Sequence, residues 1–179
     1  MLSRNSAVLV AIDFQGNLFQ AMNDRDNLLM NAVKVIKGAA IFNVPIIVTE
    51  QVPQKLGPTI APIAGELNDY QPVGKENFSC WENKKFREKL EAFSRSNVII
   101  TGIECHVCVY QTAVDLIENG YIVHVVADAV SSRTKANSEI GLAAMKSRGA
   151  HLTSTEMVLF ELLRTAADPR SRDLFKIVK

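Results

Sequence analysis

The stretch NVIITGIECHVCVYQTAVDLIENG, residues 97–120, contains one complete strand and one complete helix. Its first part, residues 97–102, includes the consecutive β-branched residues Val98, Ile99 and Ile100, which favour a strand buried on both faces. Residues 107–118 follow a helical pattern, and the pair Asn119 and Gly120 is typical of a helix end. A strand that leads directly into a helix is the repeating unit of proteins built around a parallel sheet.

The same alternation continues in both directions along the chain. Strands are predicted at residues 7–12, 45–49, 97–102, 121–127 and 151–153, with a short strand around Val73. Helices are predicted at residues 28–40, 83–93, 107–118 and 135–148, and another follows Ser154 or Thr155, either of which can cap it. We therefore predict a single α/β domain over residues 1–179. It is a three-layer αβα sandwich with a mainly parallel, doubly wound, Rossmann-like sheet.

The composition argues against several classes of protein. Among 179 residues, 20 Lys and Arg stand against 19 Asp and Glu, so the net charge of +1 predicts no nucleic-acid partner. The first apolar run stops at Asp13, which is too early for a signal peptide, and no uncharged stretch is long enough to predict a membrane partner. The three cysteines fit a reducing compartment, and we expect a cytoplasmic protein.

Cys105 and Cys108 are open to three plain interpretations. Their spacing is that of a redox pair, but they follow the fourth predicted strand and have neither Pro nor Gly between them. A zinc site would need two more ligands, which His124 and His151 do not supply in an obvious way. Packing in the core is the third interpretation, because free cysteine is among the most frequently buried residues.

Other polar residues fall where a parallel sheet binds ligands, at the carboxyl ends of its strands. Asp13 ends the first predicted strand, and Lys75 follows the short strand around Val73. Together with the cysteine segment they resemble the isochorismatase-like hydrolase family over nearly the whole chain. The resemblance is carried in order by Asp13-Phe14-Gln15, by Lys75 to Trp81, by Gly102 to Ala113 with Asp115 and Gly120-Tyr121, and by Val126 to Ala129.

The resemblance implies a catalytic triad. Cys108 would be the nucleophile, Asp13 the general base, and Lys75 the cation that holds Asp13 and lowers the pKa of the thiol. It also implies a cis peptide bond between Ile103 and Glu104, with the backbone N–H groups of Glu104 and Cys108 forming an oxyanion hole. Cys105 would pack locally. The family's activity implies hydrolysis of a small amide, imide or carbamoyl-type substrate, and the alternative is a non-catalytic small-molecule-binding protein that keeps the pocket.

One departure from the family concerns metal ions. Nicotinamidases of this family bind a metal through Asp-x-His at the end of the second strand, where this chain has Thr49-Glu50-Gln51. No histidine occurs between Met1 and Cys105, so we expect no metal and no other cofactor. Residues 49–59 resemble instead a divergent eukaryotic branch of isochorismatase-domain proteins.

Two further expectations concern binding. His106, beside the nucleophile, has no role that its position alone assigns. Candidates for substrate binding are Phe14, Gln15, Phe19, Gln51, Phe78 and Trp81.

The C-terminal segments are rich in apolar residues, which predicts a homo-oligomer, as is common in the family. These residues are Met157, Val158, Leu159, Phe160, Leu162, Leu163, Leu174, Phe175 and Ile177.

Overall fold

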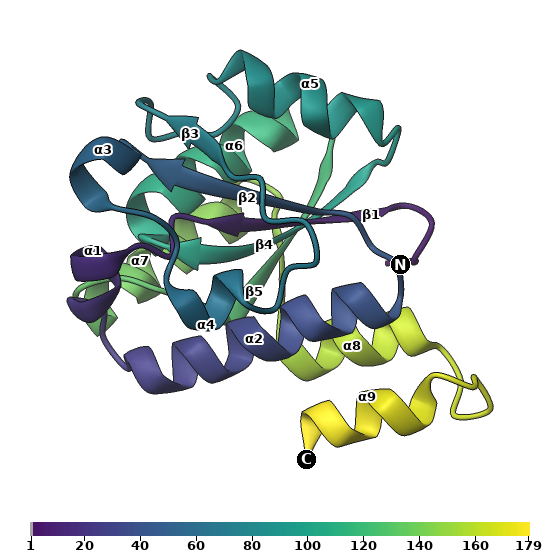
Figure 1. The fold of residues 1–179 in the computed structure, drawn as a ribbon. Coiled ribbons are helices and arrows are strands. Elements are labelled where there is room, and N and C mark those ends of the chain that lie inside the picture. Colours follow the sequence, from purple (N-terminus) through teal and green to yellow (C-terminus); the bar gives the residue numbers. More distant parts are fainter. Residues whose placement is uncertain (1) are drawn as a thin grey trace.

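The computed structural model describes residues 2–179 and contains a six-stranded sheet in the order β3-β2-β1-β4-β5-β6 (Figure 1). Neighbouring strands are parallel throughout, so the predicted doubly wound α/β class is confirmed. The strands are β1 (Ala7–Ile12), β2 (Ile46–Gln51), β3 (Val73–Lys75), β4 (Asn97–Ile103), β5 (Ile122–Ser131) and β6 (His151–Thr153). The helices are α1 (Gly16–Gln20), α2 (Arg25–Ile41), α3 (Pro53–Leu56), α4 (Ala61–Ala64), α5 (Lys84–Ala92), the π-helical η1 (Cys105–Val109), α6 (Tyr110–Glu118), α7 (Lys135–Ser147), α8 (Thr155–Leu163) and α9 (Ser171–Val178).

Alternate residues of β1 face two separate hydrophobic cores, because side chains of a strand point to opposite sides of the sheet. Leu9 and Ala11 pack with apolar residues of α2, α8 and α9. Val10 and Ile12 pack with apolar residues of α5, α6 and α7. Figure 1 shows α2, α8 and α9 on one side of the sheet and α5 and α6 on the other. This double coverage explains why β1 is buried along its whole length.

The order of the strands reverses at β1. The chain proceeds from β1 through β2 to β3 on one side, then crosses back to β4 on the other side of β1. Gly102 of β4 has a φ of 135°, and a Cβ atom there would lie 2.2 Å from the carbonyl oxygen of Ile12. Only glycine permits this close approach of the two strands. The crevice at such a reversal is where open α/β sheets bind their ligands.

The structure differs from the sequence prediction mainly at the ends of elements. The helix predicted over residues 107–118 begins earlier, at Cys105, with the π-helical η1. β5 continues to Ser131, four residues beyond the predicted end, because a shift of register lets Val130 and Ser131 pair with the end of β4. The short helices α1, α3 and α4 were not predicted, since four or five residues are too few for a periodic pattern.

No helix within residues 2–179 has both the length and the apolar character that a membrane span requires.

Candidate active site

Asp13, Lys75 and Cys108 reach the same place from three different strands. Asp13 directly follows β1, and a φ of 53° turns its backbone into the left-handed region that Asp tolerates better than most residues. Lys75 is the last residue of β3, and Cys108 lies in η1, just after β4. Because these strands are parallel and β1 lies at the reversal of order, all three residues meet at one edge of the sheet.

A buried ion pair forms the centre of this group. Lys75 Nζ lies 2.8 Å from Asp13 Oδ2, and neither side chain is exposed to solvent. The second carboxylate oxygen, Asp13 Oδ1, accepts a hydrogen bond of 2.7 Å from the Thr49 hydroxyl. Lys75 Nζ also donates to Gln51 Oε1 at 2.6 Å and to the carbonyl oxygens of residues 77 and 78 at 3.2 and 3.0 Å. The ammonium is therefore surrounded by oxygen acceptors.

These contacts fix the charge of Lys75. Burial by itself opposes the charged form, but the attraction of the Asp13 carboxylate outweighs it, and the pKa of Lys75 is raised above its ordinary value. Lys75 therefore remains a cation at neutral pH. A lysine whose donors are already occupied is suited to holding charge in place rather than to transferring a proton.

The Cys108 thiol completes the group. The residue is 5% exposed, its Sγ lies 4.0 Å from Gln51 Oε1, and the thiol is close enough to Asp13 for the charge of that carboxylate to act on it. Burial and then the charge of Asp13 raise the pKa of Cys108 to about 12, against the opposing effect of Lys75. The prediction of a lowered pKa is therefore wrong. Its physical error was to credit Lys75 with a free positive charge, which Asp13 already compensates, and to neglect the cost of removing water from the thiolate.

The other two cysteines are buried as well. Burial raises the pKa of Cys105 to about 12, and its Sγ lies 3.6 Å from the carbonyl oxygen of Ser138. Cys80 is fully buried, and its pKa is raised to about 11 by burial although Lys75 lowers it. Its Sγ lies 3.7 Å from the Thr49 hydroxyl, which itself donates to Asp13, so Cys80 lies close to the buried ion pair. No role was predicted for Cys80, and its position five residues after Lys75 was the only signal of this proximity.

The backbone beside Cys108 has an unusual conformation. The peptide bond between Ile103 and Glu104 is cis. The carbonyl oxygen of Glu104 accepts hydrogen bonds from the N–H groups of Val107 and Val109, at 3.0 and 3.2 Å. Cys108 lies between these two residues, in the first turn, where amide groups have no acceptor within the helix. The thiol is therefore beside the partially positive end of the helical segment formed by η1 and α6.

The two glutamines named as substrate-binding candidates have different positions. Gln51 lies within the group, where its Oε1 accepts from Lys75 and its Nε2 donates to the carbonyl oxygen of Glu76 at 2.6 Å. Gln15 braces the backbone instead: its Nε2 donates to the carbonyl oxygens of Gln51 and Gly57, and its Oε1 accepts from the Gln51 N–H at 2.7 Å. Gln15 thus holds the segment after β2 against the end of β1.

The aromatic candidates are not brought together. Phe14 and Phe19 are 0% and 5% exposed and belong to the core on the α2 side, whereas Cys108 belongs to the opposite core. Trp81 packs edge-on against Tyr121 and lines a different depression from Phe78. Phe78 is 53% exposed and lines a depression of about 480 Å³. Its own carbonyl oxygen is one of the acceptors of Lys75 Nζ. Of the four aromatic side chains, only Phe78 therefore borders an opening next to the ion pair.

Three further side chains near the strand ends have local structural contacts. Glu50 Oε1 accepts from the N–H and the hydroxyl of Thr59, at 2.7 and 2.9 Å, and from the hydroxyl of Tyr70. His106 Nδ1 lies 2.9 Å from the Ser132 hydroxyl. The Glu104 carboxylate forms an ion pair of 2.9 Å with Arg133. In the part of the chain that the structure describes, no cluster of three or more His, Cys, Asp or Glu side chains is arranged to hold a metal ion.

Comparison with known proteins places the chain among relatives of the same architecture. The isochorismatase domain family matches residues 7–157. Isochorismatase domain-containing protein 2 of Danio rerio is 33% identical over 99% of this chain and 89% of its own length. The MAR1 ribonuclease of Caenorhabditis elegans superposes with a TM-score of 0.93 at 32% identity, over 99% of this chain and 91% of that chain.

A bacterial protein adds a further structural relative. YcaC of Escherichia coli, an octameric hydrolase of unknown specificity, has a TM-score of 0.93 and 26% identity, over 98% of this chain and 89% of that chain. The family match spans most of the chain and the vertebrate relative is similar along nearly all of it. This chain belongs to the isochorismatase family and has its hydrolase fold.

Proposed function

We propose that this protein is a cysteine hydrolase that cleaves the C–N bond of a small amide, imide or carbamoyl-type substrate without a metal ion. One observation carries the proposal: the Cys108 thiol lies beside the ion pair of Asp13 and Lys75, which are 2.8 Å apart, and its Sγ is 4.0 Å from the Gln51 Oε1 atom that also accepts from Lys75. A nucleophile, a base within hydrogen-bond reach and a group that orients the base are the three parts of nucleophilic catalysis. Thr49-Glu50-Gln51 offers no histidine ligand, and Glu50 is already bound by Thr59 and Tyr70.

In the first half of the reaction, Asp13 takes the thiol proton while the Cys108 sulfur attacks the substrate carbonyl carbon. A C–S bond forms, and the electron pair of the C=O bond moves to oxygen, where the N–H groups of Glu104 and Cys108 donate to it. Asp13 then gives its proton to the leaving nitrogen as the C–N bond breaks. The product is a thioester on Cys108 and a free amine or ammonia, or an amide where the substrate is an imide.

In the second half, water attacks the thioester and Asp13 removes its proton. The C–S bond breaks, and the sulfur regains a proton from Asp13, which restores the resting thiol. Lys75 keeps its charge throughout, consistent with its raised pKa. A thiol pKa of about 12 makes a base essential, because almost no thiolate exists at neutral pH before Asp13 acts.

A second candidate function is binding of a small molecule without turnover. It is favoured by the burial of the group, since Asp13 is 0%, Lys75 2% and Cys108 5% exposed. The Cys108 sulfur is therefore almost fully covered, and Gln51 Oε1 lies 4.0 Å from it. The relative from Caenorhabditis elegans is named a ribonuclease, but this chain has a net charge of only +1, which favours a small substrate over RNA.

The test is a screen of small amides, imides and carbamoyl compounds for release of ammonia or amine, with RNA as a separate substrate. We expect turnover of at least one small compound, and a loss of at least about a thousandfold in kcat/KM for Cys108→Ser. Cys105→Ser is the matched control, because it removes a buried thiol three positions away and should retain activity within about threefold. Turnover that survives in Cys108→Ser would contradict the proposal, and no turnover in the wild type would favour the binding protein.

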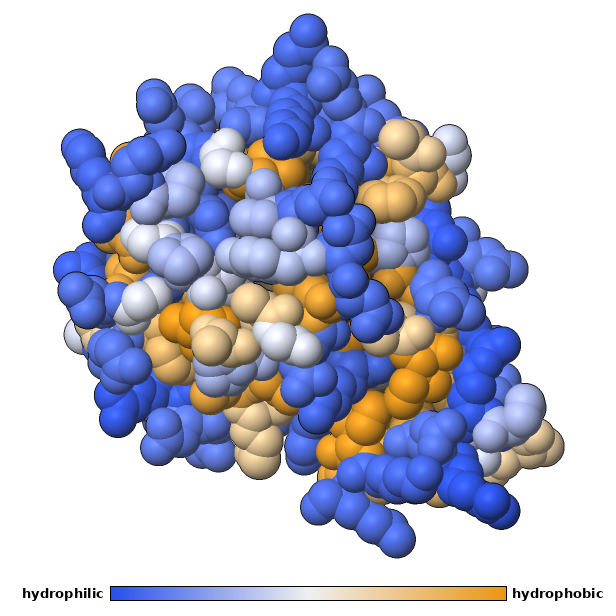
Figure 2. Space-filling model, viewed as in Figure 1, coloured by the Kyte–Doolittle hydropathy of each residue, from blue (hydrophilic) through white to orange (hydrophobic). Residues whose placement is uncertain are grey.

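We also propose that the protein forms a homo-oligomer and is cytoplasmic. Most apolar residues of α8 and α9 are in the core, but Met157, Phe160 and Phe175 are 57%, 43% and 37% exposed. The rings of Phe160 and Phe175 are 6.2 Å apart, and Figure 2 shows apolar surface in the region of α8 and α9. Since YcaC is octameric, association of copies is expected. A monomeric mass in light scattering at micromolar concentration would refute it.

A further inference from the structure

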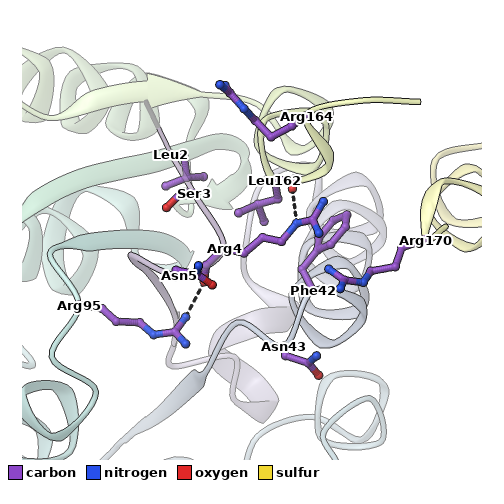
Figure 3. A pocket seen from close by; sticks show the side chains of 10 residues that line it. All are labelled: Leu2, Ser3, Arg4, Asn5, Phe42, Asn43, Arg95, Leu162, Arg164 and Arg170. Atoms are coloured by element: carbon purple, nitrogen blue, oxygen red, sulfur yellow. Dashed lines mark hydrogen bonds between the residues drawn. The ribbon is translucent and has the colours of Figure 1, made fainter. Parts of the chain in front are cut away.

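An open cavity of about 540 Å³ lies at the opposite end of the sheet from Cys108 (Figure 3). Its walls come from the segment before β1, the turn between α2 and β2, the turn before β4 and the chain after α8. We call it the amino-end cavity, because the first three of these segments precede the amino ends of strands. Four arginines line it, and no acidic residue does: Arg4, Arg95, Arg164 and Arg170.

Arg4 is the anchored member of this set. Its Nε donates to the carbonyl oxygen of Leu162 at 2.6 Å, and one terminal nitrogen donates to the carbonyl oxygen of Leu163 and to Asp168 Oδ2. The guanidinium also lies over the ring of Phe42, 4.7 Å from its centre. These contacts fix Arg4 at the end of α8 and use two of its three nitrogens. In the part of the chain that the structure describes, the remaining nitrogen makes no hydrogen bond or ion pair, and it is available to a ligand.

Arg95 and Arg170 are less completely engaged. One terminal nitrogen of Arg95 donates to the carbonyl oxygens of Arg4 and Ala7, at 2.6 and 2.8 Å, which leaves the other two nitrogens of the guanidinium. Arg170 makes a backbone hydrogen bond to Asp168, and its half-buried side chain extends toward Phe42 and Arg4 in Figure 3. Arg164 extends away from the other three in the same view. Three guanidinium groups from separate segments therefore border one space.

The charge around the cavity is not balanced. Two carboxylates flank it: Asp168 is paired with Arg4, and Glu161 accepts the N–H of Leu2 at 3.3 Å. The three arginines that border the space, Arg4, Arg95 and Arg170, and the two carboxylates leave one positive charge in a concave region. A concave surface lined by one sign of charge concentrates the electrostatic potential and attracts ions of the opposite sign.

We propose that the amino-end cavity binds a small anion that carries phosphate groups. The planar fork of guanidinium matches two phosphate oxygens at once, and several forks from different directions suit a tetrahedral anion better than a flat carboxylate. The volume of about 540 Å³ is sufficient for an inorganic polyphosphate or a small organic phosphate ester. The site is separate from the Cys108 group and does not depend on the proposed hydrolysis.

The experiment is isothermal titration calorimetry at low ionic strength with inorganic pyrophosphate and, separately, with adenosine monophosphate. We expect saturable binding of one pyrophosphate per chain, weakened at least about tenfold by Arg170→Gln, which removes a charge and a fork without breaking a side-chain hydrogen bond among the described residues. Comparable binding of adenosine monophosphate would identify an organic phosphate ester as the ligand type. Binding of pyrophosphate alone would identify an inorganic one.

Two control variants keep the outcome clear. Arg172→Gln removes the same charge from an exposed position on α9 that does not line the cavity, and affinity should stay within about twofold. Cys108→Ser should bind as the wild type does, which separates this site from the proposed hydrolase. Absence of saturable binding below about 10 mM, an equal loss in Arg172→Gln, or succinate binding as tightly as pyrophosphate would overturn the proposal.

Discussion

The two ends of the sheet contain positive charges in opposite physical situations. At the carboxyl end, Lys75 has no exposed side-chain surface and is surrounded by the Asp13 carboxylate and three neutral oxygens within 3.2 Å. At the amino end, Arg95 and Arg170 are half-buried, and neither forms an ion pair among the residues that the structure describes. A buried charge must be compensated within the protein, whereas a charge facing an open cavity can be compensated by water or by a ligand.

This difference indicates two kinds of site on one fold. The carboxyl end has its charges and donors fixed before any substrate arrives, which is what electrostatic catalysis requires. The amino end has unoccupied donors and an excess of positive charge, which is what recognition of an anion requires. The comparison can be tested by removing a charge from each end and measuring how much stability is lost.

The largest effect is expected from Lys75→Met. It leaves the Asp13 carboxylate buried without its cation, and we expect the free energy of unfolding to fall by about 3–5 kcal/mol. Urea denaturation measures this loss. The matched control is the double variant Asp13→Asn with Lys75→Met, which removes both charges and should recover a large part of the stability. A loss below about 1 kcal/mol in the single variant would mean that the pair is solvated and not buried.

An intermediate effect is expected from His124, a buried residue of β5. Burial first, and then the charge of His151, lowers the pKa of His124 from 6.5 to about 4. Between these values the unfolded chain binds the proton that the folded chain excludes, so stability is fully present above pH 6.5 and decreases as the pH falls toward 4. We expect a loss of about 2 kcal/mol between pH 7 and pH 5 from this group.

The control for this effect is His124→Gln, which retains a donor for the Asn97 Oδ1 atom that His124 Nε2 contacts at 3.0 Å. Its stability should depend less on pH over the same interval, by about the same amount. Parallel pH profiles of the wild type and the variant would show that His124 stays solvated enough to protonate without cost.

The smallest effect is expected at the amino-end cavity. Among residues 2–179, Arg170→Gln breaks no side-chain hydrogen bond or ion pair, and we expect the free energy of unfolding to change by less than about 0.5 kcal/mol. The measurement is urea denaturation at neutral pH without phosphate. A loss comparable with that of Lys75→Met would assign Arg170 a structural role and remove the contrast between the two ends.

The order of strands and helices could be predicted from the sequence because each strand is a short apolar run and each long helix has a periodic face. Residues 98–100 and the helix ending at Asn119-Gly120 are examples. The π-helical start at Cys105 could not be predicted, because it depends on a single extra residue in the first turn. The ten residues of β5 could not either, because its last part is stabilised by pairing with β4 and not by its own composition.

The meeting of Asp13, Lys75 and Cys108 was anticipated from the order of motifs, but their electrostatics were not. The motifs predict that Lys75 lies near Cys108. The direction of the shift in the pKa of the Cys108 thiol also depends on how much water reaches the thiol and on which other groups contact Lys75. The contact of Gln51 with Lys75, the position of Cys80 behind Thr49 and the burial of Phe14 all required coordinates. The amino-end cavity joins segments up to 168 residues apart, from Leu2 to Arg170, which local patterns cannot reveal.

The central claim is that Cys108 rests as a neutral thiol and reacts only when Asp13 takes its proton. The most direct test is the rate at which iodoacetamide modifies each cysteine between pH 6 and pH 9, followed by peptide mass mapping of Cys80, Cys105 and Cys108. We predict that Cys108 is modified first and at a rate nearly independent of pH, because transfer of its proton to Asp13 changes no net charge. Asp13→Asn should restore a dependence on pH. A wild-type rate that rises about tenfold per pH unit, as for an unassisted thiol with a pKa of about 12, or modification of Cys80 or Cys105 before Cys108, would contradict the account.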